Sequence, residues 1–265
     1  MNPRLAMSRS QPAAAARKQV IALPRRRRTE ILSDGAYLFE DQLSGGLLDV
    51  TLVTCAAWLL ELYELDSGDV WFEVGQQKLR AASNAFAVFY PPFSLTRPRF
   101  KEPQGRVLGI ADSTDLPVEL ASPIIFDTQF CSPNRAAEAI SLIRAGRNRQ
   151  SIDNTPFVSL TSRKAKRLID ENYLAYPSIA RIAKRIGVSH AHLSRQFRND
   201  FGMSPSEYLR RLRVADAPLR LARGEDIINV SLEVGYNDLS RFYKQFRKTT
   251  NTSPGTCKTL LRPGR

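Results

Sequence analysis

Residues 179–197, IARIAKRIGVSHAHLSRQF, and residues 227–246, IINVSLEVGYNDLSRFYKQF, repeat one pattern within the same chain. In each copy a short stretch with an apolar helical spacing ends at a glycine, and a second stretch with apolar residues four positions apart follows. This spacing places the apolar residues of each stretch on one face of a helix. Two such helices joined by a short glycine turn form the helix-turn-helix motif. The repeat therefore predicts two helix-turn-helix units, near residues 179–200 and 227–250.

Residues at the turns favour the same interpretation. Gly187 and Gly235 stand where the first helix of each unit should end, and glycine adopts a left-handed backbone at little cost. Ser189 in the first copy, and either Asn237 or Asp238 in the second, can accept hydrogen bonds from the first turn of the following helix. We therefore expect each second helix to begin at a polar cap.

A longer helix should connect the two units. The stretch Ser204–Glu207 has the form of a capping box with proline at the first helical position, and it predicts a helix over residues 205–222. Such a helix would be about 26 Å long and would act as a strut. Pro218 lies inside it, lacks a backbone donor, and is predicted to kink or shorten it. A second Ser-Pro pair, Ser253-Pro254, predicts the start of a last helix.

The charge of the chain is divided unevenly. The 265 residues carry a formal net charge of +13. Residues 155–265 hold twenty-one basic and nine acidic residues, whereas residues 30–130 hold six basic and fifteen acidic residues. Residues 1–29 hold eight basic residues and no acidic one, and they are interpreted as a disordered tail. The excess positive charge of the second half predicts an anionic partner, for which double-stranded DNA is the natural candidate.

The outer faces of the second helices carry groups suited to DNA. With Leu193 and Phe197 turned inward in the first unit, and Phe242 and Phe246 in the second, the opposite faces are polar and basic. An arginine on such a face can bond guanine in the major groove. The residues predicted to read bases are His190, Ala191, Ser194, Arg195, Leu239, Ser240, Tyr243 and Lys244. The residues predicted to contact phosphates are Arg181, Lys184, Arg198, Arg247 and Lys248.

The first half has a different pattern. Short apolar runs separated by turn residues, with alternation in Val70–Val74, predict a small antiparallel β domain. Residues 133–147 predict a helix that follows it, and residues 148–157 are interpreted as a linker. The domain boundary is placed near residue 154, so the predicted domains are a β domain with its helix over 30–154 and a DNA-binding domain over 155–265.

The sequence offers little support for an enzyme or a metal protein. Both histidines lie inside the repeat, so residues 1–154 lack the commonest metal ligand and general base. We find no nucleophile elbow, phosphate loop or zinc motif, and three scattered cysteines have no metal spacing. No apolar run approaches the roughly 20 residues that span a bilayer. We therefore expect no cofactor, no metal, no membrane association and no enzymatic activity, in a cytoplasmic protein.

At this point the chain resembles the AraC/XylS family of bacterial transcription regulators. The resemblance covers residues 162–262 and rests on IARIAKRIGVSHAHLSRQFRNDFGMSPSEYLRRLR and VSLEVGYNDLSRFYKQFRKTTNTSPGT. It implies an α+β protein in which a cupin-like β domain precedes an all-α module with two helix-turn-helix units. It further implies a nucleoid-associated regulator, more often an activator than a repressor, with a sensor or dimerisation domain. A small-molecule effector, a homodimer formed through helix 133–147, and RNA polymerase are the partners it suggests.

The chain departs from the family pattern at three places. Pro218 interrupts the strut, Asn251 replaces a usual glycine, and residues 255–257 read GTC where the family has SEY. Two other functions compete with that of a sequence-specific regulator. One is a non-specific architectural DNA-binding protein, against which the two different outer faces argue. The other is a DNA-modifying enzyme, which would need zinc-bound or nucleophilic cysteines that the scattered cysteines do not provide.

Overall fold

Two long antiparallel strands, β5 (Trp58–Val74) and β9 (Pro98–Asp112), form the centre of the N-terminal domain. The computed structural model describes residues 26–33, 35–49, 52–113, 122–175, 178–250 and 252–260. The nine-stranded sheet of the described residues has the order β1-β2-β9-β5-β7-β10-β11, with β3 beside β9 and β6 beside β5, and β4 and β8 form a separate pair. The other strands are β1 (Arg26–Ile31), β2 (Tyr37–Ser44), β3 (Leu47–Asp49), β4 (Leu52–Val53), β6 (Gln77–Arg80), β7 (Ala85–Tyr90), β8 (Leu95–Thr96), β10 (Ile124–Asp127) and β11 (Arg147–Ser151).

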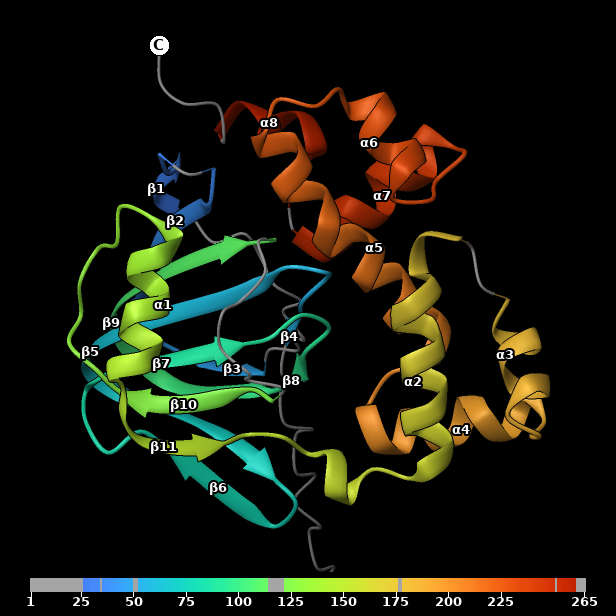
Figure 1. Cartoon of the computed structure of the whole chain (residues 1–265), viewed down its shortest axis with the longest axis horizontal. Helices are drawn as coiled ribbons and strands as arrows, with labels where there is room; N and C mark the ends of the chain where they lie inside the picture. Colours follow the sequence, from blue (N-terminus) through green and yellow to red (C-terminus); the bar gives the residue numbers. More distant parts are fainter. Residues whose placement is uncertain are drawn as a thin grey trace, which may run out of the picture.

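The alternation of side chains along β5 gives the sheet two apolar faces. Leu60 and Leu62 belong to a core that includes Ile143 of helix α1 (Ala136–Ala145), so this helix packs on its own sheet. Leu59 and Tyr63 lie on the other face, in a second core that fills the inside of the β domain. Figure 1 shows α1 on the side of the β domain that is remote from the C-terminal helices.

The C-terminal module is entirely helical. Its elements are η1 (Thr155–Phe157), α2 (Leu160–Asn172), η2 (Tyr173–Ala175), α3 (Ile179–Arg185), α4 (His190–Phe201), α5 (Pro205–Ala222), α6 (Ile227–Glu233), α7 (Leu239–Thr250) and α8 (Pro254–Leu260). The predicted fold class is confirmed: an antiparallel, cupin-like β domain precedes an all-α module in which α5 joins two helix-turn-helix units. None of the helices in the described ranges is long and apolar enough to cross a membrane.

The two parts share one apolar core. Tyr37, Val53 and Cys55 of the β domain belong to the same buried cluster as Leu212 and Leu219 of α5. Polar contacts reinforce the junction, because the Arg223 guanidinium group donates to Ser113 Oγ at 2.9 Å and that of Arg97 donates to the Phe201 carbonyl oxygen. The helical module is therefore packed against the β domain rather than tethered to it.

Two predictions about chain segments need correction. Residues 148–157 are not a plain linker, because most of β11 lies among them and its backbone pairs with β10. The range 1–29 is not entirely a tail, because β1 begins at Arg26 and pairs with β2 from there; residues 1–25 lie outside the described residues. In both cases a neighbouring strand satisfies backbone groups that the local composition gave no reason to pair. Asn251 also lies outside the described residues.

Pro218 does not shorten the strut. Helix α5 continues through it to Ala222, and the N–H of Arg223 still bonds to the Leu219 carbonyl oxygen at 3.2 Å. The turn after the proline is held by tertiary packing, because Leu221 and Ala222 are buried in the shared core. Packing of an apolar face outweighs local helix propensity, so one missing backbone donor is tolerated.

Candidate nucleic-acid interface

The first helix-turn-helix unit consists of α3 and α4. Its turn uses Gly187 at a φ of +80°, a left-handed conformation in which a residue with a Cβ atom is strained. Ser189 caps α4, because its hydroxyl oxygen accepts a hydrogen bond from the His192 N–H at 3.1 Å. Leu193 and Phe197 are fully buried and fix the inner face of α4 against the core. The opposite face of α4 is consequently held toward solvent.

The second unit, α6 and α7, repeats this arrangement. Gly235 makes the turn at a φ of +86°. Asp238, rather than Asn237, caps α7: its carboxylate accepts hydrogen bonds from the Ser240 N–H at 2.8 Å and the Arg241 N–H at 3.2 Å. Phe242 and Phe246 are fully buried, as Leu193 and Phe197 are in the first unit. The repeat in sequence is therefore a repeat in structure.

Helix α5 joins the units and anchors them to the rest of the module. Ser204 caps it by accepting from the Glu207 N–H at 3.2 Å. Burial opposes ionisation of Glu207, but hydrogen bonds and charge from Arg210 and Arg211 outweigh it and lower the pKa of this carboxyl group. Deeper in the core, the Arg213 guanidinium donates to the Tyr173 carbonyl oxygen at 2.8 Å. These contacts fix the strut to α2 and η2, and with it the two outer faces.

The structure places all thirteen residues predicted to contact DNA on the surface of the two units. Ser194 and Tyr243 are half-buried, and the other eleven are exposed. On a helix with 100° per residue, Arg195 lies about 160° from both Leu193 and Phe197, and Lys244 has the same relation to Phe242 and Phe246. The two helices thus present equivalent basic residues at the centre of their outer faces. The candidates of each helix-turn-helix unit therefore lie together on the surface of that unit.

The carboxylates of the module are engaged elsewhere. Each of its nine acidic residues has a partner within the protein, in an ion pair, a helix cap or a hydrogen bond: Asp170, Glu171, Asp200, Glu207, Asp216, Glu225, Asp226, Glu233 and Asp238. Among the described residues, none of these carboxylates pairs with a basic side chain of the predicted DNA-contact set. Apart from Arg241, which lies 3.4 Å from the Asp238 carboxylate, the basic residues of α3, α4 and α7 are therefore left without a described counter-charge, as a phosphate-binding surface requires.

Two candidates were missed from the sequence. His192 on α4 and Arg241 on α7 are exposed, occupy equivalent positions, and flank Arg195 and Lys244 on the outer faces. The helical spacing could have identified both residues, because each lies about 100° around its helix from the first buried residue, Leu193 or Phe242. Arg241 also lies 3.4 Å from the Asp238 carboxylate, so it is partly neutralised in the free protein.

The arrangement suits a binding function. The described part of the chain has no group of three or more His, Cys, Asp or Glu residues that could hold a metal ion. What the two units do offer is a pair of capped, rigidly packed helices with basic outer faces, each with hydroxyl and guanidinium or ammonium donors. Such helices fit the major groove and can bond both base edges and phosphates.

Comparison with known proteins points the same way. A family model described as a helix-turn-helix domain matches residues 182–259. The lactose operon transcription activator of Staphylococcus xylosus is 33% identical over 81 residues, which cover 30% of this chain and 29% of that protein. The transcriptional activator RhaS of Pectobacterium carotovorum is 32% identical over 87 residues, which cover 32% of this chain and 31% of that protein. The similarity thus spans about a third of the length of these curated relatives.

A solved structure aligns with more of the chain. ToxT from Vibrio cholerae matches over 86% of this chain and 98% of its own, with 13% sequence identity and a TM-score of 0.49.

Proposed function

Because the C-terminal module of this chain belongs to the AraC/XylS family of bacterial transcription regulators, we propose that the protein is a sequence-specific DNA-binding regulator. One observation carries this proposal: two rigidly packed helix-turn-helix units present basic outer faces whose basic residues, Arg241 apart, form no ion pair with a carboxylate among the described residues. The faces are equivalent in geometry but differ in residues, with Arg195 in one and Lys244 in the other. A protein that only coats DNA has no need of two different reading faces.

Within this proposal the residues of the two units have separate roles. Arg195 and Lys244, at the centres of the outer faces, read bases with their neighbours on α4 and α7. Arg181 and Lys184 lie on α3, the helix that precedes the reading helix, and with Arg198, Arg247 and Lys248 they hold phosphates. Recognition helices of this kind enter successive major grooves about one helical turn apart. Continuity of α5 through Pro218 supports a fixed spacing between them.

The N-terminal domain supplies regulation in this proposal. The two curated relatives described above are named as activators, which favours activation over repression and a contact with RNA polymerase. A homodimer would have to use the exposed side of α1, because the apolar side of that helix packs on its own sheet. We place the domain boundary near residue 154, between β11 and η1, and the protein at the bacterial nucleoid in the cytoplasm.

Selection of duplexes from a random library by the full-length protein tests the proposal. We expect enrichment of a site with two short elements whose centres lie about 10–10.5 base pairs apart. The enriched duplex should outcompete random DNA by roughly a thousandfold or more at physiological salt. Recovery of no preferred sequence, with equal affinity for all duplexes, would instead identify an architectural DNA-binding protein.

A further inference from the structure

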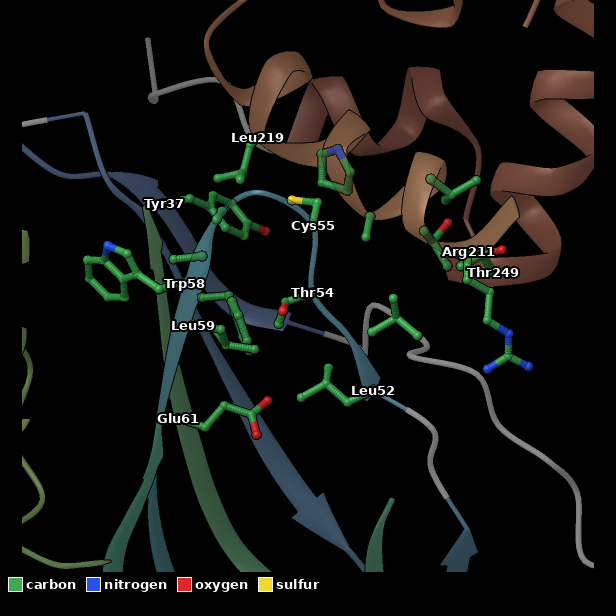
Figure 2. Close-up of a pocket in the computed structure, with 18 residues that line it drawn as sticks. Tyr37, Leu52, Thr54, Cys55, Trp58, Leu59, Glu61, Arg211, Leu219 and Thr249 are labelled. Atoms are coloured by element: carbon green, nitrogen blue, oxygen red, sulfur yellow. The ribbon is translucent and has the colours of Figure 1, made fainter. Parts of the chain in front are cut away.

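A cavity of about 140 Å³ lies at the junction of the β domain and the helical module. Figure 2 shows its walls, with strands of the β domain on one side and helices of the module on the other. The lining is mostly apolar: the β domain contributes Leu52, Val53 and Leu59, and α5 contributes Val214, Pro218 and Leu219. Tyr37, Phe39 and Trp58 add aromatic surface to the lining.

One carboxyl group of the β domain faces this apolar space. Glu61 follows Leu59 on the inner face of β5, and Figure 2 shows its carboxyl group directed toward Leu52. The Tyr63 hydroxyl donates a hydrogen bond to Glu61 Oε2 at 2.7 Å. The hydroxyl of Tyr90 is buried close by and forms no hydrogen bond of good geometry within the described structure. The Tyr90 hydroxyl near Glu61 therefore remains available as a hydrogen-bond donor.

Among the residues that the structure describes, no basic side chain forms an ion pair with the Glu61 carboxyl group. Burial raises the pKa of Glu61, and the hydrogen bond from Tyr63 only partly offsets this effect. Burial and the neighbouring carboxylate raise the pKa values of Tyr63 and Tyr90, so both phenols are neutral donors at physiological pH. Arg211 is the basic residue in the cavity lining, but Figure 2 shows its guanidinium group pointing away from Glu61, and its Nε bonds to Glu207 at 3.1 Å.

A partly buried carboxyl group in an apolar cavity, with neutral donors and no described cation beside it, favours a cationic ligand. A cation placed there would restore the ionised form and gain a strong charge-assisted hydrogen bond in a water-poor site. We infer that the cavity binds a small organic cation, a protonated primary amine on a single ring or short alkyl chain, with Glu61 as its counter-ion.

The volume limits the size of the ligand. An apolar protein cavity of roughly 150 Å³ holds a benzene molecule. The present cavity is of about that size, so it accommodates one ring with a one-carbon substituent, or an alkyl chain of similar volume. Benzylamine is therefore a suitable probe, and benzyl alcohol and benzoate are its neutral and anionic analogues.

The position of the cavity couples it to the DNA-reading helices. Val214, Ala215 and Pro218 of the strut line it, and so do Thr249 and Thr250 at the end of α7, the second reading helix. An occupant would thus contact the β domain, the strut and the second unit at once. This regulatory part of the inference rests on the proposed function, whereas ligand binding itself does not.

Calorimetric titration of the full-length protein, without DNA, tests the binding site. We expect benzylamine to bind the wild type more tightly than benzyl alcohol and benzoate at pH 7.5. Glu61→Gln should weaken benzylamine by about 30-fold or more, because the counter-ion is lost from a buried site. Glu64→Gln is the matched control: it lies on the same strand, pairs with Arg106 at the surface, and should leave benzylamine binding unchanged.

Several outcomes would overturn the inference. Tighter binding of benzoate than of benzylamine would make Arg211 the anchor. Equal binding of benzylamine by Glu61→Gln and the wild type would show that Glu61 is not the counter-ion. Binding of none of the three probes would show that the cavity is not a site for such ligands. The ranking of the probes on the wild type is decisive even if Glu61→Gln fails to fold. Ala215→Phe, which fills the cavity from α5, should abolish benzylamine binding, and retained binding would place the ligand elsewhere.

Regulation is measured separately, on a preferred duplex. Benzylamine should change the affinity of the wild type and Glu64→Gln for DNA by about fivefold or more, and that of Glu61→Gln should not respond. Ligand binding without any change in DNA affinity would contradict the regulatory part. Failure of the wild type to prefer any duplex would remove the proposed function but leave the amine site standing, so the two failures are distinguishable.

Discussion

Lys166 on α2 reaches across the junction between the two domains and donates a hydrogen bond of 2.6 Å to the backbone carbonyl oxygen of Phe93 in the β domain. The same ammonium group lies 2.7 Å from the carboxylate of Asp170, which also accepts a hydrogen bond of 2.6 Å from the Tyr208 hydroxyl on α5. One lysine therefore connects the β domain, the first helix of the module and the strut.

Replacing Lys166 by methionine should destabilise the protein by about 2–3 kcal/mol, because it leaves the Asp170 carboxylate largely buried without its cation. Urea denaturation of the full-length protein measures this change. Arg167→Met is the matched control, since the neighbouring Arg167 side chain is 81% exposed and its pair with Glu171 should be worth no more than about 0.5 kcal/mol. Equal losses for the two variants would show that the Lys166 contacts do not stabilise the junction.

Glu61→Gln should stabilise the unliganded protein in a pH-dependent way. Burial raises the pKa of Glu61 in the folded protein above its unfolded value of about 4.3, so the folded state binds the proton more tightly. The contribution of protonated Glu61 to the free energy of unfolding of the wild type is fully present below about pH 4.3, and it is lost as the pH rises through the pKa of Glu61 in the folded protein. Thermal unfolding should therefore show the variant melting above the wild type at pH 8, with the difference closing toward pH 4. A constant difference across this range would contradict the assigned pKa direction.

The turn of the first unit depends on its left-handed residue. Gly187→Ala should cost about 1 kcal/mol, because a Cβ atom at this φ strains the backbone although it would meet no atom within 4 Å. Asn tolerates the left-handed region better, so Gly187→Asn should cost less than Gly187→Ala. Denaturation of both variants checks the order, and a smaller cost for alanine would mean that contacts rather than backbone conformation limit the position.

The cap of α7 provides a similar comparison between adjacent residues. Asp238→Ala removes the acceptor for two backbone N–H groups and should cost about 1 kcal/mol of stability. Asn237→Ala removes an exposed side chain for which no capping bond is seen in the described structure, and it should change stability by less than about 0.5 kcal/mol. If denaturation showed Asn237→Ala to be the more damaging change, Asn237 rather than Asp238 would be the cap of α7.

Local sequence signals were sufficient for most of the helical module. The spacing of Leu193 and Phe197, and of Phe242 and Phe246, correctly predicted which face of each reading helix is buried. The predicted turn glycines have the expected left-handed backbone. These features depend on residues a few positions apart, so the sequence determines them directly. The cap of α7 needed the structure, because Asn237 and Asp238 are both good capping residues.

Features that depend on distant parts of the chain were not predictable. Pro218 is an unfavourable helix residue, and only the packing of Leu221 and Ala222 explains why α5 continues through it. Strand β11 forms because β10 offers it backbone partners, not because its polar sequence favours a strand. The role of Glu61 could not be predicted from the sequence, because a carboxylate between Leu59 and Tyr63 on an inward face contradicts the usual alternation of apolar and polar residues. The cavity that it lines is formed by residues of two domains.

The central claim is that the outer face of α4 reads base sequence, with Arg195 as its principal contact. Binding titrations of the wild type, Arg195→Ala and Lys184→Ala, on the preferred duplex and on random duplexes at several salt concentrations, test it most directly. Lys184→Ala should weaken all duplexes alike and reduce the salt slope by about one. Arg195→Ala should cost about 1–3 kcal/mol on the preferred duplex and much less on random DNA, with relaxed preference at one or two base pairs. An equal loss on both duplexes for Arg195→Ala would identify Arg195 as a phosphate contact and contradict the account.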